Sequence, residues 1–358
     1  MTRFLLITSV LSLSLAIACG DDVKDDTAPP EGDTDTDTDA DTDADTDADT
    51  DADTDSDTDT DVVYEFETLA TYMADNDLDL PTMLSSWIVA AQDAFDAGLD
   101  SYFIVDLRTS DKDGNGVVDF IDGHIPGAHS VALADLSDYV AANNTDSKQV
   151  LVYCYTGTTS AQATMGLRLL GLDAVSLKWG MSGWHSDFDL WTAATGDAAL
   201  DYDSWTMDST VPAVGSFDAP MIETGETDGD AILAAQMDAR VWDGTNKVVA
   251  ADVLASPEDY QVFNYWGFDD WDHYGHIDGS YQLTPGEIGL ADLDIFDPSA
   301  SIVIYCWSGQ TAAMFAGWLQ TLGYDANAMV YSANTMIYSS LESHKWSASA
   351  DLSYDTGE

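Results

Sequence analysis

Apolar and polar positions follow different patterns in three successive parts of the chain. Residues 4–18 are an apolar stretch, whereas residues 33–61 consist only of Asp, Thr, Ala and Ser. From Val62 onward, short runs rich in β-branched and aromatic residues alternate with segments of helical periodicity. Strands that alternate with helices form parallel sheets with helices on both faces, so this last part is predicted to have an α/β fold.

Three β-rich runs near the start of this α/β region predict strands. They are SYFIVDL at 101–107, VLVYC at 150–154 and AVSLKW at 174–179. Residues 160–171 have helical periodicity and end at Gly171, a residue type that often ends helices. A helix is therefore expected directly after the strand that ends at Cys154.

The α/β region also repeats itself, which predicts two similar domains. His124 and Cys154 are 30 positions apart, and so are His276 and Cys306. Four pairs of segments align: 88–108 with 248–266, 123–131 with 275–283, 150–161 with 302–313, and 167–177 with 319–329. Each copy is expected to form a central parallel sheet flanked by helices.

The N-terminal residues 1–19 are typical of a secretory signal peptide, because Arg3 precedes the apolar stretch and small residues precede Cys19. The apolar stretch is too short to favour a membrane-spanning helix. The residues AIAC resemble a bacterial lipobox, which would make Cys19 a lipidated first residue. The alternative is an ordinary signal peptide that is cut nearby. We expect an exported protein, periplasmic or at the cell surface, anchored to a membrane by lipid.

Charge distinguishes the segment that follows. Residues 21–61 contain 20 acidic residues and one Lys, so this segment should repel itself and form a disordered acidic linker. The formal net charge of the whole chain is −56, which argues against nucleic acid as a partner. The expected organisation is a signal peptide at 1–19, a linker at 20–61, a first domain at 62–190, a connection at 191–227, a second domain at 228–348 and a tail at 349–358.

Two cysteines remain in the α/β region, Cys154 and Cys306. An even pair in an exported protein suggests a disulfide, but equivalent positions in two repeats indicate two copies of one site instead. Each cysteine follows a strand and precedes a Gly/Thr-rich turn and a helix. Backbone N–H groups and the helix N-terminus stabilise a negatively charged sulfur at such a place. Thr158, Thr159 and Ser160 are expected to cap the helix.

Motifs around Cys154 occur in a familiar order. VDLR at 105–108, GHIPGAHSV at 123–131, CYTGTTS at 154–160 and LKWGMSGW at 177–184 together resemble a rhodanese domain, the fold of sulfurtransferases. The second copy is similar but more divergent, and its loop CWSGQTA at 306–312 resembles the C-x-x-G-x-T-A loop of two-domain sulfurtransferases. The resemblance covers residues 65–190 and 228–347.

The resemblance implies a sulfurtransferase or sulfane-sulfur carrier that forms a persulfide on Cys154, and on Cys306 as its second copy. Asp106 and Arg108 match the D-x-R of the family and are interpreted mainly as a supporting ion pair, with substrate binding as the alternative. A small-molecule or protein persulfide or thiol is the implied partner, and no organic cofactor is expected. The implied substrate-binding residues are Arg108, Tyr155, Thr156, Gly157, Thr158, Thr159, Trp307, Ser308, Gly309, Gln310 and Thr311.

The chain departs from the family pattern in its charges. Many single-domain relatives have Arg where this chain has Thr159, and the second loop has Thr311 there. Neither loop contains Lys or Arg, so thiosulfate is expected to be a poor substrate on electrostatic grounds. The missing Arg also argues against the related cysteine phosphatases.

The second copy departs further, because Asn264 and Trp266 replace the Asp and Arg of the first. His124 and His276 lie in a turn motif, where a structural role is favoured over catalysis.

An insertion in the first copy predicts a calcium site. The residues DKDGNGVVDFID at 111–122 fit the loop of an EF-hand, with Gly116 at its sharp turn. An acidic surface turn with a chance match is the alternative. The expected Ca²⁺ ligands are Asp111, Asp113, Asn115, Val117 through its carbonyl, Asp119 and Asp122.

Two functions follow from these patterns. The first is sulfur transfer through Cys154, and through Cys306 as well. The alternative is a non-catalytic, calcium-stabilised surface protein that uses rhodanese folds for binding or sensing.

Overall fold

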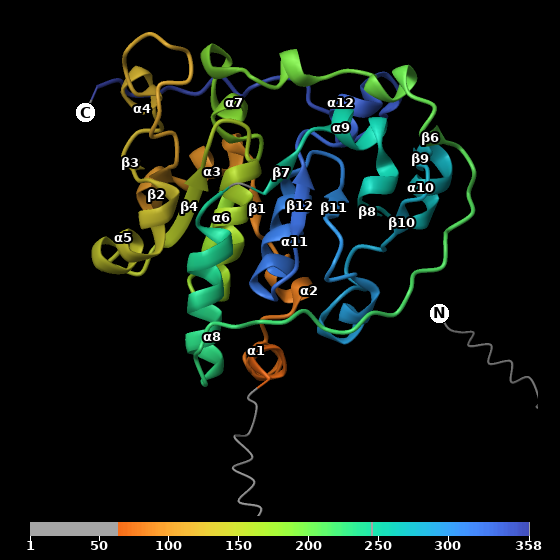
Figure 1. Ribbon diagram of the computed structural model, residues 1–358. Helices are drawn as coiled ribbons and strands as arrows, with labels where there is room; N and C mark the ends of the chain where they lie inside the picture. Colours follow the sequence, from red (N-terminus) through yellow and green to blue (C-terminus); the bar gives the residue numbers. More distant parts are fainter. Residues whose placement is uncertain (1–63, 245, 358) are drawn as a thin grey trace, which may run out of the picture. The chain divides into compact units, whose positions relative to one another are not determined.

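The computed structural model describes residues 64–244 and 246–357 (Figure 1). The expected signal peptide, Cys19 and the acidic linker lie outside the described residues. No helix in the described part of the chain combines the length and the apolar character that crossing a membrane requires.

The first sheet contains the three strands expected from the sequence and two short ones. All neighbouring strands pair in parallel, in the order β1-β5-β4-β2-β3. The strands are β1 (Ile88–Val89), β2 (Tyr102–Asp106), β3 (His129–Ser130), β4 (Gln149–Tyr153) and β5 (Ala174–Leu177).

The second sheet repeats this topology. Its order is β10-β8-β11-β12-β7, again with parallel pairing, so each strand has a counterpart in the first sheet. The strands are β7 (Lys247–Val248), β8 (Gln261–Asn264), β10 (Tyr281–Gln282), β11 (Ile302–Tyr305) and β12 (Ala326–Met329). Two further strands, β6 (Trp205–Thr206) and β9 (His276–Ile277), form a separate antiparallel pair.

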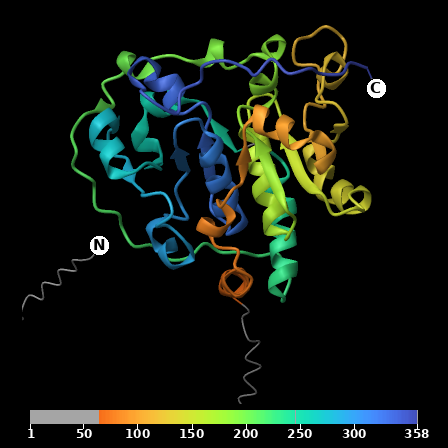
Figure 2. The same cartoon turned by 180° about the vertical axis from the view of Figure 1, so that it is seen from behind.

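Helices cover both sheets, as the alternating pattern predicts (Figures 1 and 2). In the first repeat, which we define as residues 62–190, they are α1 (Glu65–Asp75), α2 (Leu80–Met83), α3 (Ala91–Ala97), α4 (Asp119–Asp122), α5 (Leu136–Asn143), α6 (Thr158–Leu169) and α7 (Gly180–Trp184). In the second repeat, residues 228–348, they are α8 (Gly229–Gln236), α9 (Ala250–Ala255), α10 (Phe268–Tyr274), α11 (Gln310–Thr321) and α12 (Ala333–Met336), with a π-helical turn at Met237–Val241.

The two repeats share one large hydrophobic cluster, and each repeat also has a smaller cluster of its own. Helices α6 and α11 pack against each other, and the apolar residues around them form one buried cluster that draws on both repeats. Gln162 in α6 donates to Gln320 in α11 at 3.2 Å within this interface. Because nearly every side chain of α6 is buried, its two faces must both be covered, one by its own sheet and the other by α11.

Two segments outside the repeats are built into the structure. In the connection, β6 pairs with β9 of the second repeat, and Thr224 donates to Glu65 of α1. Residues 349–357, which the sequence analysis treats as a tail, lie against the first repeat. Asp355 and His124 exchange backbone hydrogen bonds of 2.9 Å, so the C-terminal segment is anchored beside the GHIPG turn.

Candidate active site at the Cys154 loop

Cys154 lies at the end of β4, where the chain turns into α6. Its Sγ accepts hydrogen bonds from the N–H groups of Gly157 at 3.2 Å and Ser160 at 3.4 Å. Gly157 has a φ of 94°, a left-handed conformation that favours glycine. The sulfur therefore receives backbone donors from the first turn of a helix, which is the arrangement that stabilises a thiolate or a persulfide.

The hydroxyl groups of the loop do not cap α6, contrary to the sequence-based expectation. Gly157 occupies the N-cap position without a side-chain cap. Ser160 Oγ donates to Gly157 O and hydrogen-bonds Ser176 Oγ, whereas Thr159 Oγ1 accepts from a lysine described below. The Cys154 sulfur takes the N–H group of Ser160, so it performs the capping role itself.

The second loop has the same geometry. Cys306 Sγ accepts from Gly309 N at 3.2 Å and from Ala312 N at 3.4 Å, and Gly309 has a φ of 80°. Cys154 and Cys306 are both free thiols and both buried, with 3% and 2% of their surface exposed. Sequence repetition is thus matched by two equivalent sulfur environments.

The two loops are in contact through Gln310. A Cβ atom added to Gly157 would lie 1.9 Å from Gln310 Nε2, so the absence of a side chain at Gly157 lets this amide approach. Gln310 Oε1 accepts from the backbone N–H of Trp179 at 3.2 Å. Gln310 therefore connects the second loop to the first repeat, and its substrate-binding role stays a prediction.

The described residues bring two lysines to the first loop, although the loop itself contains none. Lys247, the first residue of β7, donates to Thr159 Oγ1 at 2.8 Å and to Gly244 O at 3.1 Å. Burial lowers the pKa of Lys247, and the Cys154 sulfur opposes this shift. Lys112 Nζ lies 4.6 Å from the ring centroid of Tyr155. No local signal in the sequence points to either lysine, because both come from other segments.

Aromatic side chains from both repeats cover the first loop. Trp191 is fully buried and its Nε1 donates to Thr156 O at 3.1 Å. Its ring packs edge-to-face against Trp179, at 4.4 Å, and against Tyr331, at 4.8 Å. Burial raises the pKa of Tyr331, and the nearby Cys154 sulfur adds to this shift. A substrate must therefore approach Cys154 past a cluster that includes residues of the second repeat.

The remaining residues of the second loop have their own partners. Trp307 stacks between Trp266, at 4.4 Å, and His344, at 4.9 Å. Ser308 Oγ accepts from Gln310 N, and Thr311 is half-buried. Trp266 thus fills the place that Arg108 has in the first repeat, and it does so by aromatic packing.

Arg108 is buried and fully engaged beside the first loop. Its Nη2 lies 2.7 Å from Asp106 Oδ2 and donates to Gly123 O at 2.5 Å, and the side chain is 1% exposed. Burial acts to lower the pKa of Arg108, but the Asp106 carboxylate outweighs it and raises the pKa. Such a pair suits the supporting role expected for it, and substrate binding by Arg108 stays a prediction.

The two histidines are also structural in their surroundings. His124 Nδ1 hydrogen-bonds Phe120 O at 2.9 Å, and the ring stacks on Phe120. His276 stacks on Trp271 with 3.4 Å between ring centroids.

The predicted calcium loop is folded around Asp111. Its two carboxylate oxygens accept from the N–H groups of Gly114, Asn115 and Gly116. The hydrogen bond from Gly116 lowers the pKa of Asp111. Carboxylate oxygens of Asp111, Asp113 and Asp119 lie within 4.8 Å of one another. Three carboxylate oxygens this close are a donor set that suits a hard cation such as Ca²⁺.

Other expected ligands take part in the same loop. Asn115 Nδ2 donates to Asp122 Oδ2 at 2.7 Å, and Asn115 Oδ1 accepts from Val117 N at 2.7 Å.

The hydroxyl of Tyr155 links the predicted calcium loop, the acidic loop of residues 111–122, to the cysteine loop. The hydroxyl of Tyr155 donates to Asp119 Oδ2 and hydrogen-bonds Ser110 Oγ at 3.1 Å. Burial raises the pKa of Tyr155 to about 12, and the bond to Asp119 adds to the shift. Tyr155 directly follows Cys154, so the position of Asp119 is transmitted to the loop that holds the sulfur.

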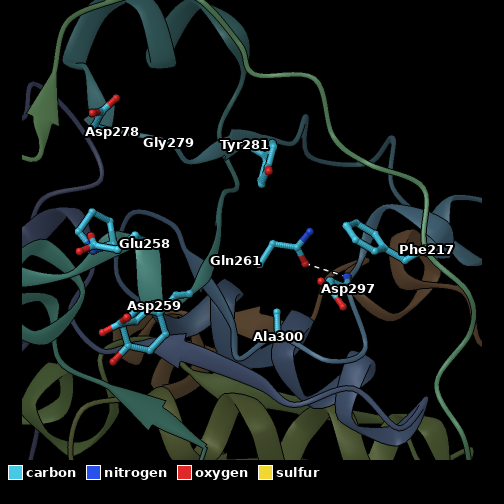
Figure 3. Close-up of a pocket in the computed structure, with 11 residues that line it drawn as sticks. Phe217, Glu258, Asp259, Gln261, Asp278, Gly279, Tyr281, Asp297 and Ala300 are labelled. Carbon is cyan, nitrogen blue, oxygen red and sulfur yellow. Dashed lines mark hydrogen bonds between the residues drawn. The ribbon is translucent and has the colours of Figure 1, made fainter.

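Two of the cavities in the described part of the chain are similar in volume. One, of about 470 Å³, is lined by Tyr155, Arg108, the acidic loop and Tyr354 of the C-terminal segment. The other, of about 510 Å³, lies at the start of β8, where Asp297 N donates to Gln261 Oε1 (Figure 3). Cys306 follows the C-terminal end of β11, whereas this cavity lies at the N-terminal end of the parallel strand β8. The cavity is therefore remote from Cys306. Neither cavity is lined by a cysteine.

Comparison with known proteins gives one family match. The family described as the rhodanese-like domain matches residues 90–187, a range that includes Asp106, Arg108 and the Cys154 loop. The second repeat lies outside this match. No curated protein matches the chain.

Several solved structures are similar to parts of the chain. A rhodanese-related protein from Thermoplasma volcanium is 24% identical over 27% of this chain and 87% of its own, with a TM-score of 0.23. A rhodanese-like domain protein from Staphylococcus aureus is 25% identical over 26% and 86%, with a TM-score of 0.22. A thiosulfate sulfurtransferase from Pseudomonas aeruginosa is 19% identical over 80% of this chain and 49% of its own, with a TM-score of 0.26. The chain thus spans about half the length of the last protein.

Proposed function

We propose that the protein carries or transfers sulfane sulfur as a persulfide on Cys154. The observation that supports this proposal is the position of its Sγ, which accepts N–H bonds from Gly157 and Ser160 at the start of α6. The rhodanese-like match over residues 90–187 includes this loop. Cys306 Sγ accepts from the equivalent N–H groups of its own loop, those of Gly309 and Ala312, so Cys306 is proposed as a second carrier.

The proposed reaction has two displacement steps. In the first, the Cys154 thiolate attacks the outer sulfur of a persulfide or another sulfane-sulfur donor. A new S–S bond forms, the donor's S–S bond (or the C–S bond of mercaptopyruvate, which releases the pyruvate enolate) breaks, and the leaving group departs with the electron pair. In the second step a thiol or other nucleophile attacks the outer sulfur of the Cys154 persulfide and releases the Cys154 thiolate. Sulfur is transferred without an external oxidant, and the loop N–H groups hold the negative charge on sulfur throughout.

A non-catalytic binding or sensing protein is the second candidate. The low exposure of both thiols and the position of Trp191 over Thr156 favour it, because a donor must reach a sulfur that is 3% exposed.

Mass spectrometry of the full chain separates the two functions. The protein is incubated with thiosulfate, mercaptopyruvate or glutathione persulfide, and the cysteine peptides are analysed without reduction. We expect a gain of about 32 Da, one sulfur, on the Cys154 peptide. Cys154→Ser should remove the gain at position 154 and leave Cys306 able to load, and Cys306→Ser should do the reverse, so each variant is the matched control for the other. If no donor loads either cysteine, the binding or sensing function is favoured.

We further propose that residues 111–122 bind a structural Ca²⁺ ion. Asp111, Asp113, Asn115, Asp119, Asp122 and the carbonyl of Val117 would hold it. When bound, the ion neutralises part of this acidic cluster. The hydrogen bond from Tyr155 to Asp119 would then couple the position of the cysteine loop to that of residues 111–122.

Thermal unfolding with and without Ca²⁺ tests this site. Ca²⁺ at about 100 times its Kd should stabilise the protein by about 2.7 kcal/mol. Asp111→Ala should remove the effect, whereas Asp100→Ala, at an exposed position outside the loop, should leave it unchanged. A calcium effect that survives Asp111→Ala would place the ion elsewhere.

We propose export and lipid anchoring through Cys19, with residues 20–61 as a tether that holds the α/β region away from the membrane. Detergent partitioning of the mature protein, compared with that of Cys19→Ser, tests the anchor: only the native chain should enter the detergent phase.

A further inference from the structure

Lys247 is a charged group beside the Cys154 loop that the proposed reaction has not yet used. It belongs to the second repeat, but its Nζ lies 2.8 Å from Thr159 Oγ1 in the first. Thr159 is the position where many rhodanese relatives carry Arg. The lysine therefore brings an ammonium to the loop position at which this chain lacks a guanidinium.

A cation beside Cys154 is important because the acidic residues of the α/β region repel an anionic sulfur donor. Residues 62–358 contain 46 acidic and eight basic residues. The N–H groups of Gly157 and Ser160 stabilise a negative sulfur, but they carry only partial charges. An ammonium has three N–H groups, and Thr159 and Gly244 are the acceptors for two of them in the described residues. The remaining group can meet a bound anion.

The ammonium of Lys247 lies beside the Cys154 loop, and among the described residues the second loop has no equivalent of it. Lys247 pairs with Ala328 across β7 and β12, and Ile88 pairs with Ser176 across β1 and β5. Ile88 is thus the counterpart of Lys247, and it carries no charge. Within the described part of the chain, no Lys or Arg side chain is hydrogen-bonded to residues 306–312.

We propose that Lys247 is the positioning residue that brings a positive charge to Thr159 of the Cys154 loop, so that Cys154, and not Cys306, is the thiol suited to anionic sulfur donors. This inference extends the proposed function, because it assigns the donor charge that the Cys154 persulfide site would accept. It also changes the expectation that thiosulfate is a poor substrate, which rested on the lack of Lys and Arg in the loop and on the acidic surroundings.

Competing alkylation of the full chain tests the charge directly. Peptide mass spectrometry gives the rates at Cys154 and Cys306 for iodoacetamide, which is neutral, and iodoacetate, which is an anion. The ratio of the two rates cancels accessibility at each thiol. We expect Lys247→Met to lower the iodoacetate-to-iodoacetamide ratio at Cys154 by about threefold or more. The ratio at Cys306 should stay the same.

Three further variants separate charge from packing. Lys247→Arg keeps the charge and should keep the native ratio, whereas Lys247→Gln should behave like Lys247→Met. Lys178→Met removes a lysine whose Nζ lies 5.3 Å from the Trp179 ring centroid and should have no effect. An unchanged iodoacetamide rate at Cys306 reports an intact fold.

Equal ratios in the native chain and in Lys247→Met would overturn the assignment, and so would an Arg variant that behaves like the Met variant. Failure of the proposed function has a different signature: no donor loads Cys154, while the alkylation ratio still depends on Lys247.

Discussion

Two buried side chains, Cys154 and His276, have structural roles that are unusual for their residue types. The Cys154 sulfur caps α6, since it accepts the N–H group of Ser160 while the nearby hydroxyls bind elsewhere. His276 is 3% exposed, stacks on Trp271, and its Nδ1 has no hydrogen-bond partner among the described residues. A buried imidazole without a partner is held in its neutral form.

Stability should depend on pH through His276. Burial lowers its pKa to about 4, below the ordinary value near 6.5. The unfolded chain binds this proton first as pH falls, so the contribution of the neutral ring is complete above pH 6.5 and is lost between pH 6.5 and 4. Urea unfolding should show that His276→Asn loses about 2 kcal/mol less stability than the native chain between pH 7.5 and 5.

His273→Asn is the matched control, because His273 is 57% exposed and should leave the pH dependence unchanged. An identical pH dependence of the native chain and His276→Asn would show that His276 does not contribute.

Contacts between short elements decide how the Cys154 loop is held. Gly180, the first residue of α7, has a φ of 61°, and a Cβ there would lie 2.6 Å from Cys154 O and 2.7 Å from Gly157 N. The turn after β5 can therefore lie directly against the backbone of the cysteine loop. Ser182 Oγ also donates to Tyr155 O at 3.0 Å, so α7 supports the loop from one side.

Gly180→Ala should damage both stability and sulfur loading. The added Cβ meets backbone atoms that cannot move aside, so we expect a loss of about 2–4 kcal/mol in the free energy of unfolding. Gly171→Ala is the matched control: its φ is 78°, but nothing lies within 4 Å of the added atom. It should cost about 1 kcal/mol. Persulfide loading should fall at Cys154 and persist at Cys306 in Gly180→Ala. Equal losses at both thiols would contradict a local effect.

At the scale of the whole molecule, the two repeats are one structural unit. Their facing helices α6 and α11 belong to a common buried cluster, and Trp242 and Met237 of the second repeat pack on Gly166 of α6. Residues 349–357 return from the second repeat to pair with the first. The Cys154 site depends on this assembly, because Lys247, Gln310 and Tyr331 all come from the second repeat.

A pair of glycine substitutions tests this shared core. In Gly166→Ala the new Cβ would lie 2.4 Å from Trp242 Cη2, and we expect overpacking to cost about 1–3 kcal/mol. In Gly317→Ala on α11 the nearest atoms are 3.5 Å away, so the free energy of unfolding should stay the same or rise by up to about 1 kcal/mol. Tryptophan fluorescence and circular dichroism should report one common transition for Gly166→Ala. Two separate transitions would mean that the repeats unfold independently.

Much of the fold could be predicted because its signals are local. The runs around β2, β4 and β5 are recognisable as strands, and the 30-residue spacing from His124 to Cys154 recurs in the second repeat. Hydrogen-bonding preferences within a few residues also determine the Asp111 turn. The predicted hydroxyl caps of α6 were wrong, because the Cys154 sulfur competes with the loop hydroxyls for the same N–H groups.

The alternation of strands and helices, the repeat, the two strand-end thiols and the acidic loop could be predicted, because each depends on residues near one another in the chain. Which groups meet at Cys154 depends on how distant segments pack. Lys247 and Thr159 are 88 positions apart, and they meet because the two repeats pack through α6 and α11. The periodicity of apolar residues predicts that a helix face is buried, but it does not predict which residues cover that face. The charge at the Cys154 site therefore depends on the tertiary packing of the two repeats.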